Sequence, residues 1–139
     1  MIFRRAVWLY APPLFWAGLI FFMSHRPAPA AMPAMAGSDK IIHLSVYLVL
    51  ALLVVRALSE QRQVDALGLV AVSVLVVGLY GVGDEVHQSF VPSRSPDVLD
   101  AYADLAGATI GSIAGAWGRT RKKRGMLARA AIDTYRSQT

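Results

Sequence analysis

Cysteine is absent from the sequence. Its absence excludes a disulfide framework, a thiolate nucleophile and any zinc or iron–sulfur site with cysteine ligands. Charge is also scarce, because Asp, Glu, Lys and Arg make up only 17% of the chain and only nine residues are acidic. Base-reading motifs and aromatic stacking platforms are missing too, so the net charge of +5 does not indicate a nucleic-acid partner.

Long apolar runs dominate the sequence instead. Hydrophobic residues make up 55% of the 139 residues, which is well above the share in soluble proteins. A membrane-spanning helix needs roughly 17–25 mostly apolar residues. Four segments qualify, at residues 6–23, 40–58, 66–83 and 98–117. The sequence therefore predicts an all-α integral membrane bundle of four transmembrane helices within residues 1–118, followed by a basic cytoplasmic tail at 119–139.

The first apolar segment contains Pro12 and Pro13, which predict a kink or an early break because proline removes a helical hydrogen bond. A secretory signal peptide is the alternative, since Arg4 and Arg5 precede the segment and the small residues at 34–36 resemble a cleavage site. The apolar run is long for a signal peptide, so we expect a transmembrane helix.

Both termini are predicted to be cytoplasmic, because Lys and Arg collect in cytoplasmic loops. In this orientation most of the 14 basic residues lie inside, namely Arg4, Arg5, Arg56, Arg62, Arg119, Arg121, Lys122, Lys123, Arg124, Arg129 and Arg136. The others, Arg26, Lys40 and Arg94, lie outside. The basic tail suits anionic lipid headgroups, as a short surface helix or a disordered segment. The expected location is the bacterial cytoplasmic (inner) membrane, with multiple passes.

Most of the acidic residues and two histidines gather on the outer side in this orientation. They are Asp39, Asp84, Glu85, Asp97, Asp100, Asp104, His43 and His87. Side chains three or four positions apart share a helix face, as do Asp39 and His43 in the second helix. Together with Gln88 and Arg94, these residues predict one polar pocket, covered by the polar loop between the third and fourth helices on the outer face.

The fourth segment carries Asp100 and Asp104 near its start. A lipid-facing carboxylate costs about 2.5–3.5 kcal/mol on insertion scales, so both side chains should face protein or water. Gly107, Gly111 and Gly115 follow on nearly the same stripe, and small residues four positions apart let a neighbouring helix approach closely. We therefore expect this helix to pack tightly, with its acids pointing into the bundle.

The loop before the fourth helix also has structural interpretations. Ser95 suits a helix N-cap and Pro96 suits the first helical position, so Asp97 would stabilise the first turn. Arg94 would neutralise Asp84 or Asp97. On this interpretation part of the polar cluster has no role beyond holding the helices in place.

Three stretches of the sequence resemble the VanZ-like family of small bacterial membrane proteins. They are FFMSHRP at 21–27, DKIIHLSVYLVLALL at 39–53 and GVGDEVHQSFVPSRSPDVLDAYADLAGATIG at 81–111. The family pattern has an Asp-Lys-x-x-His helix entry, an Asp-Glu-x-x-Gln loop with a later Arg, and an Asp and a second polar residue leading into a glycine-bearing helix. The resemblance covers about the first 115 residues. The chain departs from it at Asp104, where the family often has Asn, and in the basic tail.

The resemblance implies a link to resistance against teicoplanin, a glycopeptide antibiotic that acts on the cell wall. The residues themselves favour an outer-face site that binds or acts on a lipid-linked or cell-wall ligand, and whether the protein is an enzyme stays open. The alternative is a non-catalytic structural or interaction protein whose polar cluster only holds the helices together. Transport is less favoured, because four short helices without an inverted repeat would need a homodimer.

A divalent metal is one cofactor hypothesis for this site, because carboxylates with imidazole suit Mg, Mn or Zn. The candidate ligands are Asp84, Glu85 and His87, together with Asp100 or His43. Their spacing matches no known ligand motif. A second hypothesis has His43 as a general base while Arg94 holds a phosphate. The expected partners are the lipid bilayer and a lipid-linked or cell-wall ligand, with a homodimer left open.

Overall fold

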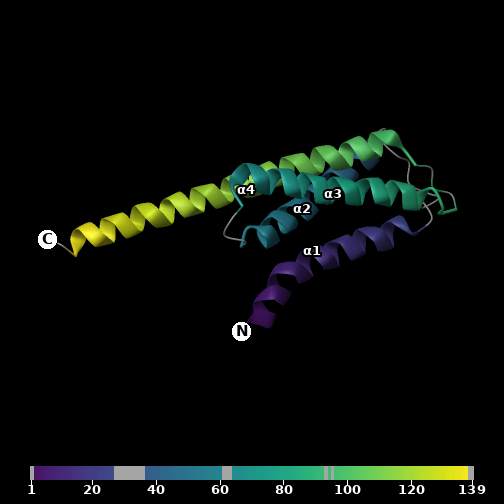
Figure 1. The fold of residues 1–139 in the computed structure, drawn as a ribbon. Coiled ribbons are helices and arrows are strands. Elements are labelled where there is room, and N and C mark those ends of the chain that lie inside the picture. Colours follow the sequence, from purple (N-terminus) through teal and green to yellow (C-terminus); the bar gives the residue numbers. More distant parts are fainter. Residues whose placement is uncertain (1, 27–36, 61–63, 93, 95, 138–139) are drawn as a thin grey trace.

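The computed structural model describes residues 2–26, 37–60, 64–92, 94 and 96–137. Within these ranges the chain forms four helices and no strand, which confirms the all-α prediction (Figure 1). The helices are α1 (Ile2–Ser24), α2 (Ser38–Leu58), α3 (Ala66–Gln88) and α4 (Val98–Arg136). Helices α1, α2 and α3 are long and apolar enough to cross a membrane by length and composition.

Helix α1 continues through both of its prolines and packs against α2 and α3. Its ribbon changes direction in its N-terminal half, as expected where proline replaces a hydrogen-bonded residue (Figure 1). The indole Nε1 of Trp16 donates to the carbonyl oxygen of Val46 at 3.0 Å, and the Tyr80 hydroxyl donates to that of Ala17 at 2.6 Å. These two bonds hold the C-terminal part of α1 against α2 and α3.

Helix α4 is longer than the sequence analysis predicted. It does not end near residue 117 but runs unbroken for 39 residues to Arg136, so the basic tail is its second half. Residues 118–136 contain no proline and are rich in Arg, Ala and Lys, which are strong helix formers. Ala116 is the last buried residue, and beyond it the helix projects from the bundle (Figure 1). Burial, and not secondary structure, therefore separates the two parts.

The tightest packing in the bundle is between α2 and the first half of α4. A Cβ atom added at Gly107 would overlap the carbonyl oxygen of Leu44, and one added at Gly111 would overlap that of Leu48. Both glycines are buried, so backbone lies directly against backbone along this interface. This close approach fixes how far the side chains near the start of α4 reach into the bundle.

The N-cap of α4 differs from the predicted N-cap, although the helix begins at the predicted residue 98. Asp97 is the N-cap, because its side chain accepts a hydrogen bond from the backbone N–H of Leu99 at 2.8 Å. The helix begins at Val98, so Pro96 lies outside it, and Ser95 lies outside the described residues. An Asp side chain can satisfy the free N–H groups of a first turn as well as serine does, and the sequence offered both.

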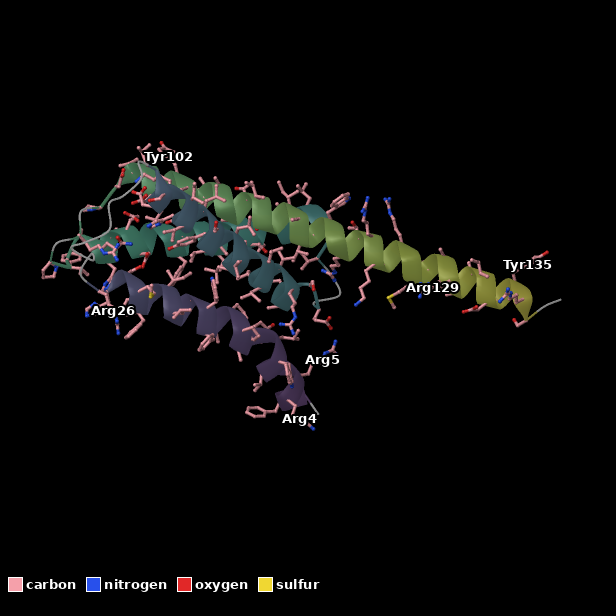
Figure 2. The ribbon with its side chains drawn as sticks, turned by 180° about the vertical axis from the view of Figure 1, so that it is seen from behind. Arg4, Arg5, Arg26, Tyr102, Arg129 and Tyr135 are labelled. Carbon is pink, nitrogen blue, oxygen red and sulfur yellow. The ribbon has the colours of Figure 1, made fainter. Side chains whose placement is uncertain are left out.

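The two ends of the bundle carry different charges. Figure 2 shows Arg4 and Arg5 at the opposite end from Arg26 and Tyr102. Arg5 forms an ion pair with Glu60 in the connection after α2. The described acids of the predicted pocket lie at the other end, where α2 and α4 begin and α3 finishes.

Candidate functional site

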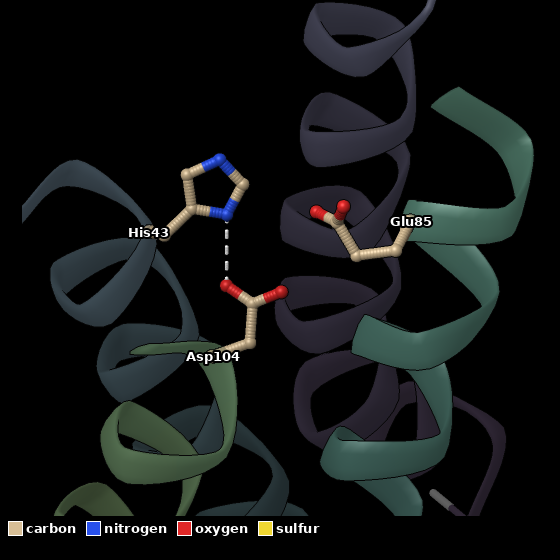
Figure 3. Close-up of side chains that lie close together, drawn as sticks. All are labelled: His43, Glu85 and Asp104. Atoms are coloured by element: carbon tan, nitrogen blue, oxygen red, sulfur yellow. Dashed lines mark hydrogen bonds and ion pairs between the residues drawn. The ribbon is translucent and has the colours of Figure 1, made fainter. Parts of the chain in front are cut away.

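Three side chains from three different helices meet inside the bundle: His43 of α2, Glu85 of α3 and Asp104 of α4 (Figure 3). The Nδ1 atom of His43 lies 2.9 Å from Oδ1 of Asp104, within hydrogen-bonding distance. One potential ligand atom from each of the three residues lies within 4.8 Å of the other two. Asp104 is only 1% exposed and Glu85 8%, so both carboxyl groups are removed from bulk solvent.

Small residues allow this meeting. A Cβ at Gly81 would lie 3.1 Å from Cβ of Asp104 and 3.1 Å from the Tyr47 ring, so α3 can approach Asp104 only because glycine stands there. Gly107, one turn after Asp104, lets α4 press against Leu44 of α2. Glycines on two helices therefore determine the depth at which Asp104 is buried.

Two oxygens of this group have no hydrogen-bond partner among the residues that the structure describes. They are Oδ2 of Asp104 and Oε1 of Glu85. The other Glu85 oxygen, Oε2, accepts a hydrogen bond from the backbone N–H of Asp97 at 3.1 Å. Leaving a buried polar atom unpaired costs about 1–3 kcal/mol, and more when the group is charged. The site therefore has an unused capacity to bind a proton donor or a cation.

Lys40 organises the acids at the outer edge. Its Nζ atom donates to carboxylate oxygens of Asp39 at 3.0 Å, Asp97 at 2.5 Å and Asp100 at 2.6 Å. Its hydrogen bond lowers the pKa of the Asp97 carboxyl below the ordinary value of 3.8. Asp100 also lies 3.9 Å from Nε2 of His43, which links this outer network to the inner group. The sequence analysis counted Lys40 only as an outer charge and did not identify this role.

Asp84 and Gln88 belong to a second buried group, formed with the end of α1. The Ser24 hydroxyl donates to Oδ2 of Asp84 at 2.7 Å, and Nε2 of Gln88 donates to the same oxygen at 3.1 Å. All three residues are buried. The sequence analysis quoted Ser24 only within the FFMSHRP stretch and assigned it no role, because its contact with Asp84 depends on how α1 packs against α3.

His87 points away from both groups. Its Nε2 atom lies 3.2 Å from Nδ1 of His25, and its ring packs on Phe21 with 4.5 Å between centroids. The sequence analysis gave His25 no role. Of the metal ligands that the sequence analysis proposed, Glu85 and His43 therefore lie close together with Asp104 beside them, whereas Asp84 bonds Ser24 and His87 contacts His25.

Arg94 contacts no carboxylate in the described part of the chain. Its Nε atom donates to the carbonyl oxygen of Arg26 at 3.2 Å, and its Nη2 atom donates to that of Met23 at 3.3 Å. The suggested neutralisation of Asp84 or Asp97 is wrong for this reason. The last carbonyls of a helix have no intrahelical partner, and a nearby cation satisfies them while complementing the helix dipole.

A cavity of about 270 Å³ lies between α1, α2 and α3. Its walls are mostly apolar, and they include Trp16, Leu19, Ile20, Ile42 and Val46. One end is polar and contains Ser24, His43, Asp84, Gln88 and Arg94. His43 therefore belongs both to the cavity wall and to the group with Glu85 and Asp104. Apolar walls with a few polar groups at one end are typical of a binding site for an amphiphilic molecule.

Comparison with known proteins gives one match. Residues 7–117 match the family model described as VanZ/LLP1. The match covers most of the chain, includes every residue of both buried groups, and ends before the projecting half of α4. The searches of curated proteins and of solved structures each found no match.

Proposed function

The chain belongs to the VanZ-like family of membrane proteins, and we propose that it binds a lipid-linked ligand of the cell envelope in the cavity between α1, α2 and α3. The apolar part of the ligand lies along the walls, and its phosphate-bearing head lies at the polar end beside Arg94. The proposal concerns binding and leaves open whether the bound molecule also reacts.

The observation that carries this proposal is the division of the cavity into an apolar and a polar part. Trp16, Ile42 and Val46 offer surface to a hydrocarbon chain, and each Å² of apolar surface removed from water contributes about 25 cal/mol. At the other end Arg94 offers N–H donors, because only two of its five N–H groups bond the carbonyl oxygens of Arg26 and Met23. The planar guanidinium of arginine suits a phosphate group, which binds it through two parallel hydrogen bonds.

The proposal includes an arrangement in the bacterial inner membrane. The first half of α4, from residue 98 to 117, forms a fourth span beside α1, α2 and α3, and both termini are cytoplasmic. The burial of Asp104 between helices supports this span, because its carboxylate faces protein and not lipid. The excess of Lys and Arg at the end that carries Arg4 and Arg5 supports the orientation (Figure 2).

The absence of cysteine makes the orientation easy to test. Phe90→Cys places one thiol in the connection after α3, and Tyr135→Cys places one near the end of α4; the two side chains are 80% and 71% exposed. An impermeant maleimide applied to intact spheroplasts should label Phe90→Cys at once and Tyr135→Cys only after lysis. Labelling of Tyr135→Cys in intact spheroplasts would contradict the orientation.

A binding experiment tests the ligand. The full chain in lipid nanodiscs is mixed with a photoreactive polyprenyl phosphate, and crosslinking is measured against competing unlabelled lipid. Ile42→Trp fills the cavity and should weaken binding at least tenfold. Leu75→Trp is the matched control, because Leu75 lines a different groove between α3 and α4. Equal binding by wild type and Ile42→Trp would refute the site.

The head group is tested separately with Arg94→Ala. This variant should lose affinity for the polyprenyl phosphate and keep it for the uncharged polyprenol, since only the phosphate needs the guanidinium.

A parallel assay measures teicoplanin resistance in cells that express wild type, His43→Ala, Glu85→Gln, Arg94→Ala or Asp100→Asn at matched membrane levels. Protection by wild type and not by the folded variants would connect the pocket to the phenotype implied by the family.

A structural role is the second candidate for the outermost acids. Lys40 already bonds Asp39, Asp97 and Asp100, so these three need no ligand to explain their placement. If Asp100→Asn lowers thermal stability but leaves crosslinking and protection unchanged, this outer network is architecture. The inner group of His43, Glu85 and Asp104 would not be affected by that result.

A further inference from the structure

The inner group has a donor set that fits a metal ion. His43 offers an imidazole nitrogen, and Glu85 and Asp104 each offer a carboxylate oxygen, with the three atoms within 4.8 Å of one another (Figure 3). Ligand atoms bound at about 2.1 Å to a tetrahedral Zn²⁺ lie roughly 3.4 Å apart. The three ligand atoms therefore need to approach one another by at most about 1.4 Å, a distance on the scale of a side-chain rotation.

The unpaired oxygens are an independent sign that this group binds something. Oδ2 of Asp104, on a side chain 1% exposed, has no hydrogen-bond partner among the described residues, and the same is true of Oε1 of Glu85, 8% exposed. Buried carboxylates are normally paired with cations or coordinate metals. Figure 3 shows the Glu85 carboxylate turned toward the oxygen of Asp104 that is not bonded to His43. The two carboxyl groups that each carry an unpaired oxygen thus face the same space.

No side-chain cation of the described chain fills that need. Lys40 bonds the three outer aspartates, and Arg94 bonds backbone carbonyls at the end of α1. Neither forms an ion pair with Glu85 or Asp104 within the part of the chain that the structure describes. His43 is the one basic side chain at the inner group, and a single imidazole does not balance two carboxylates.

From these observations we propose that His43, Glu85 and Asp104 bind one divalent transition-metal ion, Zn²⁺ or Mn²⁺. Imidazole favours Zn²⁺ over Mg²⁺ and Ca²⁺, while two carboxylates keep Mn²⁺ within range. Three protein ligands leave an open coordination position, as in catalytic zinc sites. The inference deepens the proposed function: His43 lines the cavity, and a cation there offsets the buried negative charge that would repel a phosphate head.

Metal binding is measured on the full chain in nanodiscs, stripped with EDTA and titrated with Zn²⁺ alone and with Mn²⁺ alone. Ion content after desalting is read by inductively coupled plasma mass spectrometry. Wild type should retain about one ion per chain, and His43→Ala, Glu85→Gln and Asp104→Asn should each bind at least tenfold more weakly. Asp133→Asn is the matched control for Asp104→Asn, because Asp133 is exposed on the projecting half of α4.

Two further measurements distinguish loss of metal binding from loss of the fold. Glu85→Gln leaves the His43–Asp104 hydrogen bond intact, so it separates loss of a ligand from loss of the fold. Co²⁺ added to wild type should give the visible absorption of a tetrahedral site with nitrogen and oxygen ligands. The proposal is refuted if wild type retains neither ion, or if Glu85→Gln and Asp104→Asn bind as tightly as Asp133→Asn.

The metal assay contains no polyprenyl phosphate, so its outcome is independent of the crosslinking experiment. A chain that binds the ion and not the lipid supports the metal site and refutes the proposed ligand. A chain that binds the lipid and not the ion supports the proposed ligand and refutes the metal site. Glu85 and Asp104 then share a proton with His43 in place of a metal.

Discussion

The two halves of α4 form one continuous helix and have opposite environments. From Val98 to Trp117 the helix lies in the bundle, where Asp104, Gly107 and Gly111 are buried. From residue 121 onward every described residue is exposed. Glycine occurs in both halves, yet a Cβ at Gly107 would overlap backbone, whereas one at Gly118 or Gly125 would meet nothing within 4 Å. The same residue type thus serves packing in one half and has no packing role in the other.

The difference between the halves shows what a buried acid requires. Asp133 in the exposed half is accessible to solvent, so its carboxylate keeps its solvation when the chain folds. Asp104 in the packed half is 1% exposed and lies where three helices meet. Its burial is possible because Gly81 and Gly107 bring α3 and α2 close enough to supply neighbouring polar groups. Tight packing and the candidate site are therefore two results of the same small residues.

Among the substitutions that test the difference between the two halves of α4, Gly107→Ala should have the largest effect. The added methyl group would overlap the carbonyl oxygen of Leu44, which belongs to the backbone and cannot rotate away. We expect a loss of about 3 kcal/mol in unfolding free energy, at the upper end of the cost of overpacking. Thermal unfolding in detergent measures it. Gly118→Ala is the matched control and should be neutral or stabilise the helix by up to about 1 kcal/mol.

Gly115→Ala tests whether the stability cost of an added methyl group falls along the same helix. A Cβ at Gly115 would lie 2.9 Å from Cγ1 of Val55, which is a side-chain atom and can move in part. The expected loss is about 1 kcal/mol, less than at Gly107, because only a side chain must shift. If both substitutions cost the same in the detergent unfolding assay, backbone contact is not what distinguishes the two positions.

Asp97→Asn tests the outer network at the start of α4, and the expected effect is small. Asparagine caps a helix as well as aspartate does, so only the contact with Lys40 is weakened. Because Lys40 lowers the pKa of Asp97, its stabilisation is fully present above the ordinary value of 3.8 and is lost as pH falls through the lower folded-state pKa. The difference in unfolding temperature between wild type and variant should therefore shrink below about pH 4. A difference that grows on acidification would exclude this explanation.

Removal of residues 119–139 should have the smallest effect on stability. The described part of this segment contributes no buried side chain, so the unfolding temperature of the bundle should change by no more than about 2 °C, within the range expected of exposed substitutions. The deletion also removes half of the basic residues, so labelling of Phe90→Cys in the shortened chain should report any change in orientation. A large drop in unfolding temperature would show that the projecting half of α4 supports the bundle.

Much of the fold could be predicted from the apolar runs. The predicted start of α3 at Ala66 and the end of α2 at Leu58 agree with the structure, because Asp65 caps one helix and the polar residues after Leu58 interrupt the other. The end of α4 could not be predicted, because the tail after residue 118 suited either a short surface helix or a disordered segment. Hydropathy marks where a helix leaves an apolar medium, and it does not mark where helical hydrogen bonding stops.

The candidate site could be predicted only in part. The spacing of Asp39 and His43, and of Asp100 and Asp104, indicated the outer end of the bundle as the place to look. It did not reveal that Asp84 pairs with Ser24, that His87 turns toward His25, or that Arg94 bonds carbonyl oxygens. These contacts join residues 60 to 68 positions apart, and their geometry depends on rotation of one helix against another.

The sequence by itself determined that this chain is helical, that three of its helices suit a membrane, and that acids and histidines gather at one end. Each of these follows from local composition and from the 3.6-residue period, which act within a single helix. Only the tertiary structure decided that Asp104 lies with His43 and Glu85, and that Lys40 bonds the outer acids. Those pairings depend on interhelical distances, which are set by where glycine allows two backbones to touch.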